Sequence, residues 1–274
     1  MLPAARPLLL VGGGKMGEAL LAGWLRGGLG TDAAFVVEPD AARRSALVAA
    51  HGVTAVPDAA DLPPTTRPGA VVLAVKPQVM DTALPGLRVL LDADTLVVSI
   101  AAGKPLALFE RALGGSMGIV RAMPNTPAVV GRGVTVLCAN GAATEAQREL
   151  AARLMAAVGA THWIEDEDLM HAVTAVSGSG PAYVFHLIEA LAAAGAAAGL
   201  PQELATQLAR GTVTGAGELA ARSAEGADTL RANVTSPGGT TAAALEVLMV
   251  AEDGLTPLLT RAVAAAAARS RVLA

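Results

Sequence analysis

The sequence predicts an α/β protein: an N-terminal doubly wound parallel sheet followed by a C-terminal all-helical domain. Short apolar runs without polar alternation recur through the first half of the chain, which is typical of strands buried on both faces of a parallel sheet. Helical stretches lie between these runs. Beyond about Trp163 the strand-like runs stop and long Ala/Leu stretches follow. We therefore expect a first domain at residues 1–165 and a second at 166–274.

The expected strands are short and end in small or polar residues. They lie at 8–11, 35–37, 70–75, 95–100 and 119–120, with a further alternating stretch at 133–138. Helices are expected between them at 41–50, 80–91 and 105–113. In the second domain they are expected at 169–176, 183–199, 201–221 and 242–249, with a terminal helix from residue 256.

Composition narrows the class of protein. Only 2% of the 274 residues are aromatic while 53% are hydrophobic, so the core must consist of Ala, Val and Leu. A net charge of −4 gives no basic footprint for nucleic acid. The single cysteine, Cys138, excludes an intrachain disulfide, and neither a zinc-ligand spacing nor a signal-peptide pattern is present. We expect a cytoplasmic protein without a metal. The uncharged stretch 169–188 contains Ser-Gly-Ser-Gly-Pro, which argues against a membrane span.

A glycine motif follows the first expected strand. Val11 runs into Gly12-Gly13-Gly14-Lys15-Met16-Gly17, and an apolar helix begins there. Strand, G-x-G-x-x-G and helix in this order form the Rossmann-type dinucleotide fingerprint. The first glycine makes the turn, the second admits the pyrophosphate, and the third lets helix and strand touch. All seven residues from Val11 to Gly17 are expected to bind the cofactor.

The choice between NAD and NADP stays open in the sequence. Glu38 ends the second expected strand, where a carboxylate can accept a hydrogen bond from the ribose 2′-hydroxyl of NAD. Arg43 and Arg44 follow, and either could meet the 2′-phosphate of NADP or lie on a solvated helix face. Asp58, further along, is also expected at the cofactor.

Other motifs end strands at the same edge of the sheet, where ligands lie in such folds. Ala74-Val75-Lys76-Pro77 turns the chain across the cofactor, and Lys76 is either a general acid or a charge near phosphate. Ala101 and Ala102 are small enough for their backbone to approach a flat ring. Met123-Pro-Asn-Thr-Pro127 makes a rigid polar corner.

The segment Ser236-Pro-Gly-Gly-Thr-Thr241 opens an apolar helix in the second domain. Free backbone N–H groups at a helix start favour a carboxylate or phosphate. An ordinary loop with a threonine cap is the alternative.

These motifs together resemble pyrroline-5-carboxylate reductase over nearly the whole chain. The resemblance is carried by residues 12–17, 74–77, 123–127, the Ser-Gly-Ser-Gly-Pro-Ala-Tyr stretch 177–183, and 236–241. It implies NAD(P)H-dependent reduction of the cyclic imine 1-pyrroline-5-carboxylate to L-proline, the last step of proline biosynthesis. It also implies a helical dimerisation domain and a homodimer that assembles into rings.

The resemblance assigns roles to residues of the second domain. Thr241 would hydrogen-bond the imine nitrogen and is the expected catalytic residue. The substrate carboxylate would lie at the helix start. The expected substrate-binding residues are Glu167, Asn233, Ser236, Gly239, Thr240 and Thr241, and Asn233 would also reach the cofactor.

Two alternatives are weighed against this interpretation. β-Hydroxyacid dehydrogenases have a similar first domain but a catalytic lysine in the second, and all three lysines here, Lys15, Lys76 and Lys104, lie in the first. A non-catalytic NAD(P) sensor would not need to keep Asn233 and the Thr240-Thr241 pair. The four histidines have no metal spacing and are expected at the surface or in satisfied interior positions.

Overall fold

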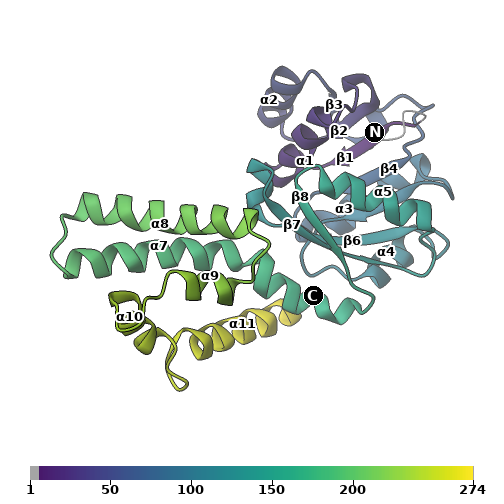
Figure 1. The fold of residues 1–274 in the computed structure, drawn as a ribbon. Helices are drawn as coiled ribbons and strands as arrows, with labels where there is room; N and C mark the ends of the chain where they lie inside the picture. Colours follow the sequence, from purple (N-terminus) through teal and green to yellow (C-terminus); the bar gives the residue numbers. More distant parts are fainter. Residues whose placement is uncertain (1–5, 274) are drawn as a thin grey trace. The chain divides into compact units, whose positions relative to one another are not determined.

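The structure is a computed structural model that describes residues 6–273; the first five residues and the last, which the expected domains include, lie outside this range. The described chain forms one eight-stranded sheet with helices between and after its strands (Figure 1). The strands are β1 Leu8–Val11, β2 Ala34–Val37, β3 Thr54–Val56, β4 Ala70–Leu73, β5 Leu96–Ser99, β6 Ile119–Met123, β7 Gly133–Ala139 and β8 Gly159–Trp163. The helices between them are α1 Lys15–Arg26, α2 Ala41–His51, α3 Met80–Leu87, α4 Leu106–Leu113 and α5 Glu145–Ala156.

The sheet order is β3-β2-β1-β4-β5-β6-β7-β8, the order of a doubly wound fold with two added strands. All neighbours pair in parallel except β6 and β7, which are antiparallel. The expected doubly wound α/β fold is confirmed, and the β6–β7 pair makes the sheet mixed. Two strands, β3 and β8, were not expected from the sequence.

Each strand contributes side chains to both faces of the sheet, since successive residues point to opposite sides. Leu8 and Leu10 of β1 pack into one core with Trp24 of α1 and Leu154 of α5, and the Trp24 indole N–H donates to the Leu154 carbonyl at 2.8 Å. Leu9 and Val11 pack into a second core, on the face that α3 and α4 cover. Burial on both faces explains why these strands are continuously apolar.

The chain divides into two compact units: residues 1–178 with 267–274, and residues 179–266. The division expected from the sequence, after residue 165, stays a prediction about independently folding domains. The remaining helices are α6 Met170–Val173, α7 Gly180–Ala197, α8 Gln202–Arg222, α9 Ala227–Asn233, α10 Thr240–Leu248 and α11 Leu255–Val272. Residues 174–178 form a single π-helical turn before α7.

Helices α7 and α8 lie side by side in the helical unit (Figure 1). Small residues make this close packing possible, because Ala192, Ala205 and Ala209 are buried and an added Cβ on Gly195 would lie 3.3 Å from the Cβ of Ala205. Small side chains therefore allow α7 and α8 to pack closely.

Candidate coenzyme and substrate sites

The glycine turn after β1 needs two of its glycines for steric reasons. Gly12 has φ +103°, and a Cβ on it would lie 2.7 Å from the Ala74 carbonyl oxygen. Its N–H donates to the Val37 carbonyl at 2.8 Å, which ties the turn to β2. A Cβ on Gly17 would overlap the Gly12 carbonyl oxygen. The turn thus brings α1 against β1 as the fingerprint requires.

Gly14 has a different role, because its surroundings are open. It is the N-cap of α1 with extended backbone (φ −63°, ψ 179°), no side chain caps the helix, and no described heavy atom lies within 4 Å of an added Cβ. The uncapped N–H groups and the positive helix end favour an anion. A pyrophosphate is the anion that the sequence predicts at this helix start. Lys15 is exposed at the first helical position and Met16 packs against the core.

The Glu38 carboxylate is held against this turn. One oxygen accepts the Gly13 N–H at 2.8 Å and the other accepts the Asp40 N–H at 3.0 Å. The side chain is half-buried at the carboxyl end of β2. Both oxygens are therefore fixed in direction, at the position where the fold binds ribose hydroxyls.

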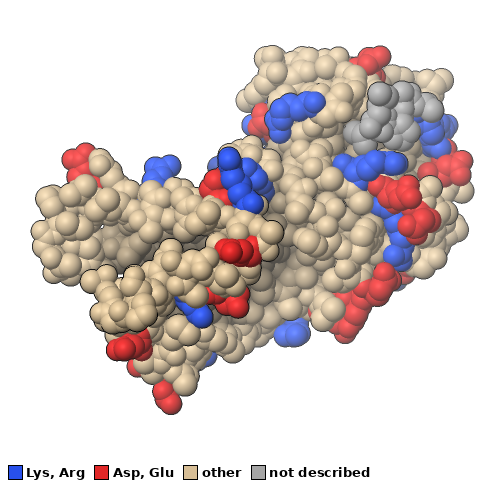
Figure 2. Space-filling view, in the orientation of Figure 1, with Lys and Arg blue, Asp and Glu red and all other residues tan. Residues whose placement is uncertain are grey.

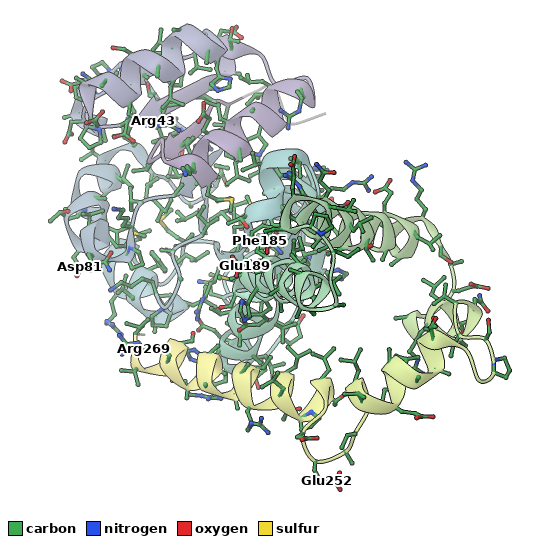
Figure 3. All side chains as sticks on the ribbon, turned by 90° about the vertical axis from the view of Figure 1, so that its left-hand side faces the viewer. Arg43, Asp81, Phe185, Glu189, Glu252 and Arg269 are labelled. Carbon is green, nitrogen blue, oxygen red and sulfur yellow. The ribbon has the colours of Figure 1, made fainter. Side chains whose placement is uncertain are left out.

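Arg43 of α2, which is labelled in Figure 3, hydrogen-bonds the same loop. Its Nε donates to the Gly13 carbonyl and its Nη2 to the Glu18 carboxylate, each at 2.5 Å. The Arg43 hydrogen bond lowers the pKa of Glu18; burial opposes this shift, and His51, whose Nε2 lies 3.3 Å from the other Glu18 oxygen, supports it. Arg44 donates through Nη1 to the carbonyls of Glu38 and Pro39.

The other expected cofactor residues of the sheet unit follow strand ends at the same edge, because β1, β2, β4 and β5 are mutually parallel. The Ala74 N–H donates to the Val11 carbonyl at 2.8 Å, so residues 74–77 leave β4 beside the glycine turn. Val75 is half-buried, Lys76 is exposed, and Pro77 starts a short 3₁₀ turn. After β5, Ala101 is buried and Ala102 exposed. Asp58 follows β3 and caps the next turn through the Ala60 N–H.

Glu167 lies in a partly buried ion pair that the sequence did not indicate. Its Oε1 accepts from Arg121 Nη1 at 2.7 Å and from the Leu106 N–H at 2.9 Å. The Arg121 side chain is only 6% exposed and that of Glu167 27%. A charged residue inside the apolar strand β6 was the available signal, because buried charges need partners. In this structure Glu167 binds protein groups of the sheet unit.

The Met123-Pro-Asn-Thr-Pro127 corner is tied to the π-helical turn through Asn125. Its Nδ2 donates to the Ser177 carbonyl at 3.1 Å, and its Oδ1 accepts the Val134 N–H at 2.8 Å. Asn125 is 9% exposed, so these bonds satisfy a buried amide. Through Asn125 the corner after β6 is hydrogen-bonded both to β7 and to residues 174–178.

The expected substrate residues of the helical unit lie around the start of α10. Gly238 has φ +67°, and the Gly239 N–H donates to the Ser236 carbonyl at 3.0 Å. Gly239 is the N-cap of α10, no side chain caps that helix, and Thr240 and Thr241 are its first residues. Ser236 and Thr240 are exposed and Thr241 is half-buried. Asn233 ends α9, where its Nδ2 donates to Glu225 at 3.1 Å.

The histidines take the expected surface or satisfied positions. His51 contacts Glu18, His171 Nδ1 lies 3.0 Å from Ser270 Oγ, His186 pairs with Glu189, and His162 is exposed. Among residues 6–273, no group of three or more His, Cys, Asp or Glu residues is placed to hold a metal ion. In the same range no helix is both long and apolar enough to span a bilayer.

Two family models match the chain. Residues 8–103 match "NADP oxidoreductase coenzyme F420-dependent", and residues 167–273 match "Pyrroline-5-carboxylate reductase dimerisation". With the glycine turn and the sheet order, these matches define an NAD(P)-dependent oxidoreductase with a helical dimerisation domain. A pyrroline-5-carboxylate reductase of Pseudomonas aeruginosa is 39% identical over 97% of this chain and 96% of its own length, and one of Synechocystis is 41% identical over 96% and 97%. The chain belongs to the pyrroline-5-carboxylate reductase family.

Solved structures agree with this assignment. A pyrroline-5-carboxylate reductase from Coxiella burnetii matches with a TM-score of 0.91 at 35% identity, covering 98% of both chains. A Plasmodium falciparum pyrroline carboxylate reductase with NADP bound matches with a TM-score of 0.80 at 29% identity and the same coverage. The family resemblance, the reductase class and the NAD(P) cofactor predicted from the sequence are confirmed.

Proposed function

We propose that this chain reduces 1-pyrroline-5-carboxylate to L-proline with NADH or NADPH, as the last step of proline biosynthesis in the cytoplasm. The observation that carries the proposal is the identity of about 40% to named reductases over nearly the whole length, with the glycine turn and the uncapped α10 start both present. When bound, the reduced coenzyme would supply a hydride to the imine carbon and would leave as NAD(P)⁺. The C=N π electrons pass to nitrogen, and one solvent proton taken up by the imine before the transfer and one taken up by the amine after it give the protonated amine of proline.

The glycine turn supports coenzyme binding in this proposal. The N–H groups at the start of α1 hold the pyrophosphate beside Gly14, where the space is open. Glu38 lies at the ribose position. Residues 74–77 and 101–102 lie at neighbouring strand ends of the same sheet edge. We assign them, with Asp58 and Asn233, to coenzyme binding.

The start of α10 supports binding of the substrate carboxylate. A carboxylate is stabilised by uncapped N–H groups and by the positive end of the helix. We assign this role to Gly239 and Thr240, with Ser236 preceding them. The Thr241 hydroxyl hydrogen-bonds the imine nitrogen and sets its direction toward the hydride. A protonated imine is already electrophilic, so orientation and electrostatics supply most of the rate enhancement. Glu167 and Asn233 complete the proposed substrate contacts.

The substitution Thr241→Val tests this assignment. It replaces the hydroxyl by a methyl group of the same size, so coenzyme binding stays at the wild-type level while kcat falls by about 10–100-fold. Thr206→Val on α8 is the matched control and keeps full activity; there the hydroxyl donates to the Gln202 carbonyl and accepts from the Gln202 Nε2. A wild-type kcat in Thr241→Val would remove Thr241 from the mechanism.

We further propose that the helical unit forms a homodimer that assembles into a larger ring. The support is its exposed apolar side chains. Figure 2 shows uncharged surface between scattered charged residues on this unit. Phe185 on α7, labelled in Figure 3, is 60% exposed, and Leu208 on α8 and Val247 on α10 are 50% and 70% exposed. Phe185→Glu should dissociate the assembly in sedimentation experiments. Val89→Glu, at a 75% exposed position of the sheet unit, is the control and should leave the mass unchanged.

A further inference from the structure

The end of strand β2 lies where the two possible coenzymes, NADH and NADPH, differ in structure. NADH and NADPH differ only at the adenosine ribose, which carries a 2′-hydroxyl in one and a 2′-phosphate in the other. Glu38 directly follows β2, where this fold binds that ribose. Its oxygens accept the Gly13 and Asp40 N–H groups at 2.8 and 3.0 Å, so the carboxylate is fixed in place. Each oxygen keeps a lone pair that a ribose hydroxyl can use.

The two arginines nearby already donate hydrogen bonds to protein groups. Arg43 donates to the Gly13 carbonyl and to the Glu18 carboxylate, so that its positive charge is compensated. Arg44 donates through Nη1 to the Glu38 and Pro39 carbonyls. A bidentate grip through Nε and Nη2 of Arg43 would require this side chain to give up its partners, and Arg44 is anchored to the backbone through Nη1.

The local charge also opposes a 2′-phosphate. The cluster contains the carboxylates of Glu18, Glu38 and Asp40 and the guanidiniums of Arg43 and Arg44, whose formal charges sum to −1. The Glu18 carboxylate pairs with Arg43, whereas those of Glu38 and Asp40 accept backbone N–H groups. Asp40 cannot move away easily, because it caps α2 by accepting the Arg43 N–H at 2.6 Å. His51, the other titratable group in contact with this cluster, faces Glu18.

We propose that Glu38 is a specificity residue that makes this reductase select NADH over NADPH. The carboxylate accepts a hydrogen bond from the 2′-hydroxyl of NADH and repels the 2′-phosphate of NADPH. Discrimination therefore comes from an attractive contact to one coenzyme and a repulsive contact to the other. The inference rests on the proposed function only for turnover, because coenzyme binding can be measured without substrate.

The test is a calorimetric titration of the full-length protein with NADH and with NADPH in the absence of substrate. Wild-type protein should bind NADH at least about tenfold more tightly than NADPH at low salt. Glu38→Ser removes the charge and should shift the ratio of the two Kd values toward NADPH by about tenfold or more. Asp32→Ser, at the amino end of β2, changes the net charge equally at the opposite edge of the sheet and should leave the ratio within about twofold.

The Glu38→Gln variant controls for a change in the structure of the glycine turn. It removes the charge and keeps an oxygen that can accept the Gly13 N–H. It should also shift the ratio toward NADPH. Equal or tighter NADPH binding by wild type would overturn the inference, as would an unchanged ratio in both Glu38 variants. A wild-type preference for NADH without turnover of 1-pyrroline-5-carboxylate would instead overturn the proposed reaction alone.

Discussion

Two alanine substitutions in the glycine turn should separate folding from coenzyme binding. In Gly17→Ala the new methyl group overlaps the Gly12 carbonyl oxygen, so α1 must move away from β1. That movement is resisted by Leu20, Leu21 and Trp24 of α1, all fully buried. Overpacking of this kind costs about 1–3 kcal/mol, and the gain from replacing a helical glycine offsets about 0.5–1 kcal/mol.

The net loss of unfolding free energy in Gly17→Ala is thus about 0.5–2 kcal/mol, equivalent to a fall in Tm of about 1–8 °C for a chain of this size. Gly14→Ala differs, because its φ and ψ suit alanine and no atom lies within 4 Å of the new methyl group. Its unfolding free energy should change by less than about 0.5 kcal/mol. The methyl group projects into the space assigned to the pyrophosphate, so coenzyme affinity should fall by about tenfold or more.

Urea unfolding followed by circular dichroism measures the first effect, and coenzyme titration measures the second. Gly86→Ala in α3, with no atom within 4 Å of the added Cβ, is the control and should keep coenzyme affinity at the wild-type level. A Gly17→Ala protein as stable as wild type, or a Gly14→Ala protein with wild-type affinity, would refute this account of the turn.

The remaining predictions concern charges and the thiol. Arg121→Met should lower the unfolding free energy by about 2–4 kcal/mol in urea unfolding, because it leaves the Glu167 carboxylate half-buried without its cation; no loss would contradict the ion pair's role. Arg43→Met should be less stable than wild type at pH 7. Because Arg43 lowers the Glu18 pKa below 4.5, that stabilisation is present above this pH and disappears as the pH falls through the folded-state pKa. A stability difference between Arg43→Met and wild type that persists at lower pH would argue against the pairing with Glu18 as its cause. Burial raises the pKa of Cys138, so its alkylation at neutral pH should be slow until urea unfolds the protein; rapid reaction in the native state would refute this.

Strands buried on both faces could be predicted from the sequence because their apolar runs are unbroken. Strand β8 was missed since Thr161 and His162 interrupt it, and His162 is exposed. Strand β3 was missed because it has only three residues at the sheet edge. The antiparallel direction of β7 depends on the corner at 123–127, which no periodicity encodes.

The glycine turn was predictable because its chemistry is local, within six residues of the chain. The partner of Glu167 was not, because Arg121 lies 46 positions away and the fold alone brings them together. Arg43 shows the same limit. The sequence left it open between a solvated helix face and a phosphate ligand, whereas the structure places it on Glu18 and the Gly13 carbonyl.

The most direct test of the proposed reaction is a steady-state assay of the purified full-length protein with 1-pyrroline-5-carboxylate, run with NADH and NADPH side by side. Coenzyme oxidation should depend on the imine, yield L-proline in equal amount, and show the higher kcat/KM with NADH. Absence of imine-dependent oxidation with both coenzymes, from protein that binds them, would contradict the proposed reaction.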